Sequence, residues 1–191
     1  MSDDFDKLAD VLIGTFGENH EQQAVTQWLS TGYLPLNHAI SGRYADGGLP
    51  SGRITEIFGP PSAGKTAIAT EVMIAAQKAG GIAAFMDHER SFDVRLGEAR
   101  GLNIHPGRWI YRKPRTFEDS VETLVTVCHK LRTSKLLAPE APIAWVFDSL
   151  ACMIPQSQIE KATSKLGMAD QTALARATSL NLRTLALYAR S

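Results

Sequence analysis

Apolar residues recur along the chain with two different periods. Residues 53–58 alternate between polar and apolar and are rich in strand-forming side chains, whereas residues 67–79 are alanine-rich and repeat apolar positions at helical spacing. Two later runs, 82–86 and 143–147, are apolar throughout, as in strands that are buried on both faces. The pattern therefore predicts strands that alternate with helices.

The segment between the two apolar runs adds a strand and a helix. Residues 109–111 predict a short strand, and residues 116–132 predict a helix that gathers apolar side chains on one face. The order of these elements predicts a doubly wound α/β fold with a mainly parallel sheet and right-handed crossovers.

The first part of the chain has a different pattern. Residues 4–16 predict a short amphipathic helix, and residues 21–29 predict a second helical stretch. Residues 30–52 are rich in glycine, proline and serine, which favours a boundary. We therefore expect an N-terminal helical appendage, residues 1–30, and a core domain, residues 31–191. The appendage packs either on its own core or on a neighbouring subunit, and the sequence leaves both open.

Composition indicates a soluble globular protein. The chain has 191 residues, 44% of them hydrophobic and 21% charged. Its two cysteines, Cys128 and Cys152, form neither a disulfide framework nor a zinc-binding pattern. The acidic N-terminus does not resemble a secretory signal, and no apolar run is long enough to span a membrane. These features predict a cytoplasmic protein.

Charge is distributed unevenly although the formal net charge is zero. Residues 1–50 contain seven acidic residues and two basic ones, whereas residues 151–191 contain five basic residues and two acidic ones. A basic C-terminal segment can bind phosphates locally, and it can equally be the solvated face of a helix. Charge alone leaves both interpretations open.

Residues 59–66 read G-P-P-S-A-G-K-T, which is a complete phosphate-loop motif between a predicted strand and a predicted helix. Glycines let successive N–H groups point at one phosphate, and the helix N-terminus adds its positive dipole. Lys65 is expected to reach the β- and γ-phosphates of ATP, and the Thr66 hydroxyl to reach Mg²⁺. The expected nucleotide contacts in this segment are Gly59, Pro60, Pro61, Ser62, Ala63, Gly64, Lys65, Thr66 and Ala67.

An acidic residue follows the next predicted strand. Glu89 lies 23 residues beyond Thr66, a distance that fits a helix and a strand. Because parallel strands deliver their carboxyl ends to the edge where ligands bind, Glu89 is expected to face the nucleotide. Such a carboxylate can orient or deprotonate the water that attacks the γ-phosphate. The alternative is a solvated acid in a surface loop.

The strand at 143–147 ends in Asp148 and Ser149. An apolar run that closes on an aspartate is typical of a Walker B strand, whose acid holds Mg²⁺ together with Thr66, here through water. The next residue is a serine and not a glutamate, so the role of catalytic base is assigned to Glu89.

Four segments together resemble bacterial and phage-type RecA recombinases: residues 30–37, 47–60, 85–89 and 147–151. The likeness runs from about Ser30 to the end of the chain. It implies a RecA-like ATPase that assembles on single-stranded DNA, pairs it with duplex DNA and exchanges strands in recombination and repair. The resemblance also implies DNA-stimulated ATP hydrolysis, with ATP and Mg²⁺ bound between adjacent subunits of a helical filament.

The resemblance assigns roles to particular residues. Glu89 and Lys65 match catalytic positions, Asp93 matches an acid that contacts the adenine amino group, and Ser149 adds to the nucleotide contacts. Leu96 stands where the family usually has an aromatic residue that stacks on adenine, so base stacking is expected to be weaker.

The C-terminal part matches the DNA-binding region of the family. Residues 156–170 correspond to a first DNA-binding loop, which is expected to be mobile. Arg176, Ser179 and Arg183 are spaced so that one helix face presents all three, and the family's residues at these positions contact the DNA backbone. The alternative is that the arginines extend over leucines of the same helix.

The resemblance also leads to expectations for the two ends of the chain. The N-terminal helix resembles the family's oligomerisation arm. After residue 191 the family continues into another core strand and a second DNA-binding loop, so we expect either a fragment or a shortened relative. Two alternatives are a regulatory or adaptor ATPase without strand exchange, and a hexameric, ring-forming motor of helicase type.

Overall fold

The centre of the molecule is a parallel three-stranded sheet with the order β4-β3-β5. The strands are β3 (Ile82–Asp87), β4 (Trp109–Arg112) and β5 (Ile143–Asp148). The structure is a computed structural model that describes residues 6–8, 10, 11, 14, 25–161 and 169–189. Each strand begins where the sequence predicts and extends one residue further at its carboxyl end.

The register brings the carboxyl ends of the strands together. Asp87 pairs with Asp148, and Met86 pairs with both Arg112 and Phe147. All six residues of β3 are buried, as an uninterrupted apolar run in a central parallel strand requires. Asp87 and Asp148 therefore lie side by side at one edge of the sheet.

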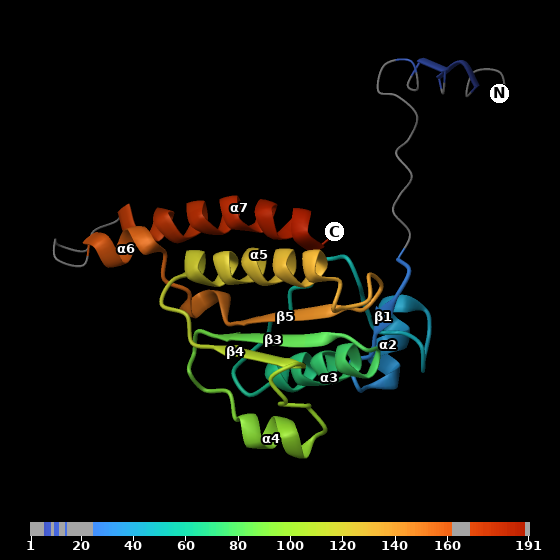
Figure 1. Cartoon of the computed structure of the whole chain (residues 1–191). Helices are drawn as coiled ribbons and strands as arrows, with labels where there is room; N and C mark the ends of the chain where they lie inside the picture. Colours follow the sequence, from blue (N-terminus) through green and yellow to red (C-terminus); the bar gives the residue numbers. More distant parts are fainter. Residues whose placement is uncertain (1–5, 9, 12–13, 15–24, 162–168, 190–191) are drawn as a thin grey trace.

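Helices cover both faces of this sheet. Helix α3 (Lys65–Lys78) lies on one face, while α5 (Phe117–Ser134) and α7 (Ala169–Ala189) lie on the other (Figure 1). This arrangement and the parallel strands agree with the expected α/β class.

Each face has its own apolar cluster. On one face Met73 and Ile74 of α3 pack with Phe85 of β3. The cluster on the other face joins α5, α7 and β5, and its buried residues are Phe117, Val121, Leu124, Met153 and Leu185.

Three short helices follow strands of the sheet in the sequence. Helix α4 (Val94–Ala99) follows β3, while the 3₁₀ helix η1 (Leu150–Cys152) and α6 (Gln156–Lys161) follow β5. Asp93 caps α4, because its side chain accepts hydrogen bonds from the N–H groups of Arg95 and Leu96. The prediction of a loop over residues 156–170 is wrong for residues 156–161, which form α6, and for residues 169 and 170, which begin α7. Residues 162–168 lie outside the described residues.

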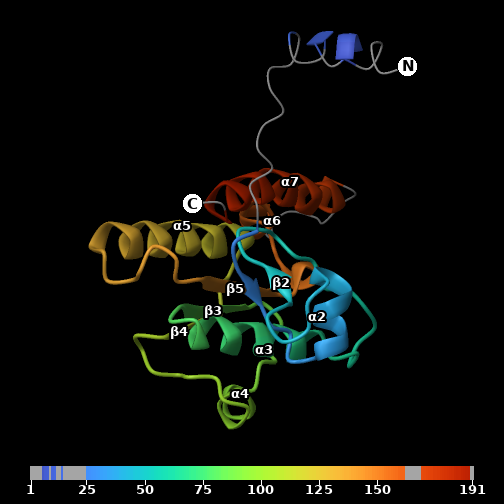
Figure 2. The ribbon, with the colours of Figure 1, turned by 90° about the vertical axis from the view of Figure 1, so that its right-hand side faces the viewer.

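Residues 28–50 form a small unit at the other end of the sheet. Strand β1 (Trp28–Leu29) pairs antiparallel with β2 (Leu49–Pro50), and α2 (Leu34–Ser41) lies beside them (Figure 2). Leu29 belongs to the apolar cluster of α3 and β3, so β1 is attached to the core. The sequence did not predict this unit, since its strands are only two residues long.

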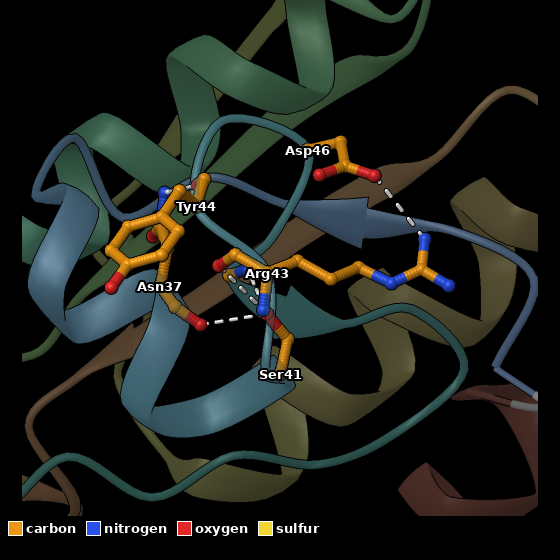
Figure 3. Close-up of polar contacts among 6 residues, drawn as sticks. Asn37, Ser41, Arg43, Tyr44 and Asp46 are labelled. Atoms are coloured by element: carbon orange, nitrogen blue, oxygen red, sulfur yellow. Dashed lines mark hydrogen bonds and ion pairs between the residues drawn. The ribbon is translucent and has the colours of Figure 1, made fainter.

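A buried amide holds the unit together. The side chain of Asn37 is fully buried; its Oδ1 accepts from the Thr31 N–H and hydroxyl, at 2.9 and 2.7 Å. Its Nδ2 donates to Ser30 Oγ and to the Tyr44 carbonyl, at 2.9 and 3.1 Å. Figure 3 shows this region, where the Ser41 hydroxyl also donates to the Asn37 carbonyl at 2.6 Å. With every polar atom paired, the amide fixes the path of the chain at little desolvation cost.

The prediction of a strand over residues 53–58 is wrong. The segment has no regular secondary structure, and the Phe58 side chain is 87% exposed. Strand-forming side chains stabilise a strand only when a neighbour supplies backbone partners. In the described part of the chain β5 pairs with β3, and no ladder joins residues 53–58 to either strand.

The predicted N-terminal helices lie mostly outside the described residues. Residues 6–8, 10, 11 and 14 are helical, in agreement with the prediction for residues 4–16. Of the second stretch, residues 21–29, the described part ends in β1 and is not helical. The division into an appendage and a core stays a prediction.

Candidate functional site

The phosphate loop leads directly into α3. Gly64 precedes the helix with a φ of 92°, a left-handed conformation that favours glycine. The first intrahelical bond runs from the Ile68 N–H to the Gly64 carbonyl at 3.0 Å. The N–H groups of residues 65–67 therefore lack partners inside the helix and can bind an anion.

Lys65 is folded back over the loop. Its Nζ donates to the carbonyls of Gly59 and Pro60, at 3.0 and 2.9 Å. These contacts place the ammonium group beside the helix N-terminus. An incoming phosphate would offer the same ammonium group a charged acceptor, which forms a stronger hydrogen bond than a carbonyl does.

Thr66 and Asp148 connect the phosphate loop with β5. The Thr66 hydroxyl donates to Asp148 Oδ2 at 2.8 Å, although the two residues are 82 positions apart. Burial raises the pKa of Asp148, and the nearby carboxylates of Glu89 and Asp87 raise it further, while the Thr66 hydrogen bond lowers it. A hydroxyl beside a carboxylate fits Mg²⁺, which prefers few protein oxygens and retains water.

Glu89 is fixed beside the same strand end. Its Oε1 accepts from the Ser149 hydroxyl at 2.6 Å. The N–H groups of His88 and Glu89 both donate to the Asp148 carbonyl, at 2.7 and 3.1 Å. The structure thus brings together Lys65, Thr66, Glu89, Asp148 and Ser149, which the sequence predicted as parts of one site.

A buried carboxylate that sequence reasoning missed shapes the turn that carries Glu89. Asp87 is 1% exposed and accepts from the Tyr111 hydroxyl at 2.7 Å and from the N–H groups of Ser91 and Phe92 at 3.3 Å. Burial and the contact with Asp87 raise the pKa of Tyr111 to about 12. The phenol therefore stays protonated as a donor. The only sequence signal was an acid at the end of a buried strand.

His88 provides a second contact that the sequence did not indicate. Its Nε2 lies 2.8 Å from the hydroxyl of Ser120, which is fully buried on α5 and donates to the Thr116 carbonyl. Which of the two groups donates in this contact depends on the tautomer of the imidazole. Burial lowers the pKa of His88, which favours the neutral imidazole. The turn carrying Glu89 is thereby attached to α5.

A cleft between α3 and α4 adjoins the phosphate loop. It has a volume of about 230 Å³. Asp93 and Leu96, two residues assigned to the adenine region, both line it. The full lining is Thr66, Ala67, Thr70, Ser91, Phe92, Asp93, Leu96, Gly97 and Arg100.

The predicted DNA-binding residues lie on the solvent face of α7. Arg176, Ser179 and Arg183 are all exposed, three and four residues apart in turn, and so share one side of the helix. The opposite side packs on α5 through residues such as Leu185. Leu180 lies beside the arginines and is 66% exposed. The helix orientation permits the predicted DNA contacts, which stay a prediction.

Comparison with known proteins adds a family relationship. Residues 5–189 match the family model described as RecA N-terminal domain. The chain is 36% identical over 157 residues to Protein RecA of Chloroherpeton thalassium, an overlap of 82% of this chain and 39% of that protein. It is 34% identical over 170 residues to Protein RecA of Bordetella avium, covering 89% of this chain and 43% of that protein.

A third relative, Protein RecA of Rubrobacter xylanophilus, is 38% identical over 132 residues. The aligned parts of these three relatives amount to 34–43% of their lengths, so the chain spans about two fifths of them. Among the residues that the structure describes, no helix combines the length and the apolar character that crossing a membrane requires.

Proposed function

The chain belongs to the RecA family, and on that premise we propose that it is an ATP-dependent, single-stranded-DNA-binding recombinase whose ATP hydrolysis DNA stimulates. It would act in the cytoplasm, in recombination and repair. The observation that carries the proposal is the convergence of Lys65, Thr66, Asp148 and Glu89 at one edge of the sheet.

In this proposal the loop and α3 bind the triphosphate. The N–H groups at the start of α3 and the Lys65 ammonium offset the negative charge that the phosphates carry. Mg²⁺, held by the Thr66 hydroxyl and through water by Asp148, would neutralise part of the charge on the β- and γ-phosphates.

Glu89 would act on the attacking water. Its carboxylate accepts a proton as the water oxygen bonds to the γ-phosphorus and the bond to the bridging oxygen breaks, which yields ADP and phosphate. The Ser149 hydroxyl donates to Oε1 of Glu89 at 2.6 Å, whereas the Ser91 hydroxyl donates to Oε2 at 3.5 Å. Oε2 has the longer contact and is the oxygen that would take this proton. Ser149 is accordingly a positioning residue.

DNA would bind along the exposed side of α7. Arg176 and Arg183 supply charge for the phosphates, and Ser179 supplies a hydroxyl between them. We propose that copies of the chain assemble through the N-terminal arm into a helical filament on single-stranded DNA, and that this filament pairs with duplex DNA.

One experiment separates this function from its rivals. ATP turnover is measured with and without single-stranded DNA, and the protein is imaged by electron microscopy with a slowly hydrolysed ATP analogue. We expect stimulated turnover and filaments. Closed rings would instead support a motor, and ATP binding without any response to DNA would support an adaptor ATPase.

A further inference from the structure

An ion pair at the end of the cleft has no role in the function proposed so far. Arg100, which follows the last residue of α4, lines the cleft, and its Nε lies 3.3 Å from Oε1 of Glu71 on α3. The side chains of Arg100 and Glu71 are 41% and 28% exposed. An ion pair this accessible adds little to folding stability, so stability alone does not account for its position.

The place of the cleft indicates what it binds. It begins at Thr66, the last residue of the phosphate-loop motif, and at Ala67, and it continues along α3 to Thr70. A group attached to a loop-bound triphosphate therefore extends into it. The lining combines apolar side chains, such as Phe92 and Leu96, with polar groups that can orient a ligand, as in sites for small organic molecules. A nucleoside fits this description.

The ion pair orients the guanidinium of Arg100. Oε1 of Glu71 lies 3.3 Å from Nε and holds the guanidinium at the end of the cleft. A guanidinium face can stack on an aromatic ring, which a lysine ammonium cannot do in the same way. Leu96 lies four residues earlier on α4, so both side chains project from the same side of the helix.

We propose that Arg100, held by Glu71, forms a wall of the base-binding site and selects purine nucleotides by stacking. Leu96 supplies apolar contact on the same wall, and the guanidinium supplies the flat surface. A purine presents a larger ring face than a pyrimidine, so stacking on Arg100 favours it. This inference rests on the proposed function, because it places a triphosphate in the phosphate loop.

The test compares three ligands that share a triphosphate: ATP, CTP and inorganic tripolyphosphate. Their affinities are measured by calorimetry for the wild-type chain and for Arg100→Ala, Arg100→Lys and Glu71→Gln. Arg95→Ala is the matched control, because it removes the same charge from an exposed position of α4 outside the cleft. Circular dichroism melting verifies that each variant is folded.

We expect Arg100→Ala to weaken ATP binding about tenfold, to weaken CTP binding less, and to leave tripolyphosphate binding unchanged. Arg100→Lys should also lose affinity for ATP, since it retains the charge but not the plane. Glu71→Gln should show a smaller loss in the same direction, and Arg95→Ala none.

Two results would overturn the inference. In the first, Arg100→Ala lowers the affinity for ATP and tripolyphosphate equally, which indicates a general charge effect. In the second, Arg100→Ala and Arg100→Lys both keep the wild-type preference for ATP over CTP. The variant Lys65→Ala tests the proposed function separately. If the phosphate loop does not bind the triphosphate, Lys65→Ala will leave tripolyphosphate binding unchanged.

Discussion

The nucleotide edge of the sheet and the solvent face of α7 carry their candidate residues in different ways. At the nucleotide edge, hydrogen bonds connect residues from separate elements, as between Thr66 and Asp148 and between Ser149 and Glu89. On α7, Arg176 and Arg183 are exposed, and within the described residues no side-chain hydrogen bond or ion pair joins them to another element.

This difference follows from the chemistry that each region is proposed to perform. Phosphoryl transfer depends on groups held in a fixed geometry, and here the residues of the site fix one another. Contacts with a phosphate backbone need positive charge along a line and tolerate mobile side chains. We therefore expect steep losses from changes at the edge and graded, salt-dependent losses from changes on α7.

The largest expected effect is at Lys65. Replacement by alanine removes the ammonium group from the loop, and we expect ATP binding to fall by about 100-fold or more in calorimetry. Lys78→Ala is the matched control, because Lys78 is exposed at the far end of the same helix. Unchanged ATP affinity in Lys65→Ala would contradict the assignment of the phosphate site.

The Glu89→Gln variant separates chemistry from binding. The amide retains an oxygen that can accept from Ser149 but cannot take a proton, so steady-state turnover should fall by about 10²- to 10⁴-fold. ATP affinity should stay within about twofold of the wild type, because the phosphate contacts lie elsewhere. If affinity and turnover fell together, Glu89 would be a binding residue.

The double variant Arg176→Ala, Arg183→Ala tests the other side of the comparison. Each arginine that neutralises a phosphate adds about one unit to the dependence of log affinity on log salt, so the slope for single-stranded DNA should decrease by about two. ATP binding in the absence of DNA should not change. A salt slope equal to that of the wild type would reject these phosphate contacts.

The smallest expected effect concerns the stability of the edge itself. Because burial raises the pKa of Asp148, the folded state disfavours its charged form, and Asp148→Asn should raise the thermal midpoint at neutral pH. The difference in the free energy of unfolding between variant and wild type is measured by urea unfolding across a pH series.

The direction in which this stability difference changes with pH follows from the raised pKa of Asp148. Below the ordinary value of 3.8, Asp148 is protonated in both the folded and the unfolded state, so variant and wild type should be similarly stable. The difference in stability between variant and wild type should increase as pH rises from 3.8 through the raised pKa of Asp148 in the folded state. A variant less stable than the wild type at neutral pH would show that the carboxylate stabilises the fold.

How far the sequence predicted the structure depended on the range of the interactions. The strands at 82–86 and 143–147 were predicted almost completely, because each is a short apolar run that follows glycine or proline, a pattern typical of buried strands. Residues 53–58 carry an equally strong local signal and form no strand, since a ladder also requires a partner.

The same distinction holds within the site. The loop and Asp148 were predicted from motifs that encode their own spacing. The contact of Ser149 with Glu89 spans 60 residues, and that of His88 with Ser120 spans 32. Both depend on the register of the sheet and on where α5 packs, and neither is visible in a linear pattern.

Tyr111 shows that the site depends on residues other than the candidate nucleotide contacts. It belongs to β4, a strand that supplies no candidate nucleotide contact, yet its phenol donates to the carboxylate that shapes the turn carrying Glu89. Loss of that hydroxyl would leave the buried Asp87 carboxylate without one of its hydrogen-bond donors, which would destabilise the turn. Variation in this outlying strand would therefore be constrained by the proposed hydrolysis, through the turn that carries Glu89.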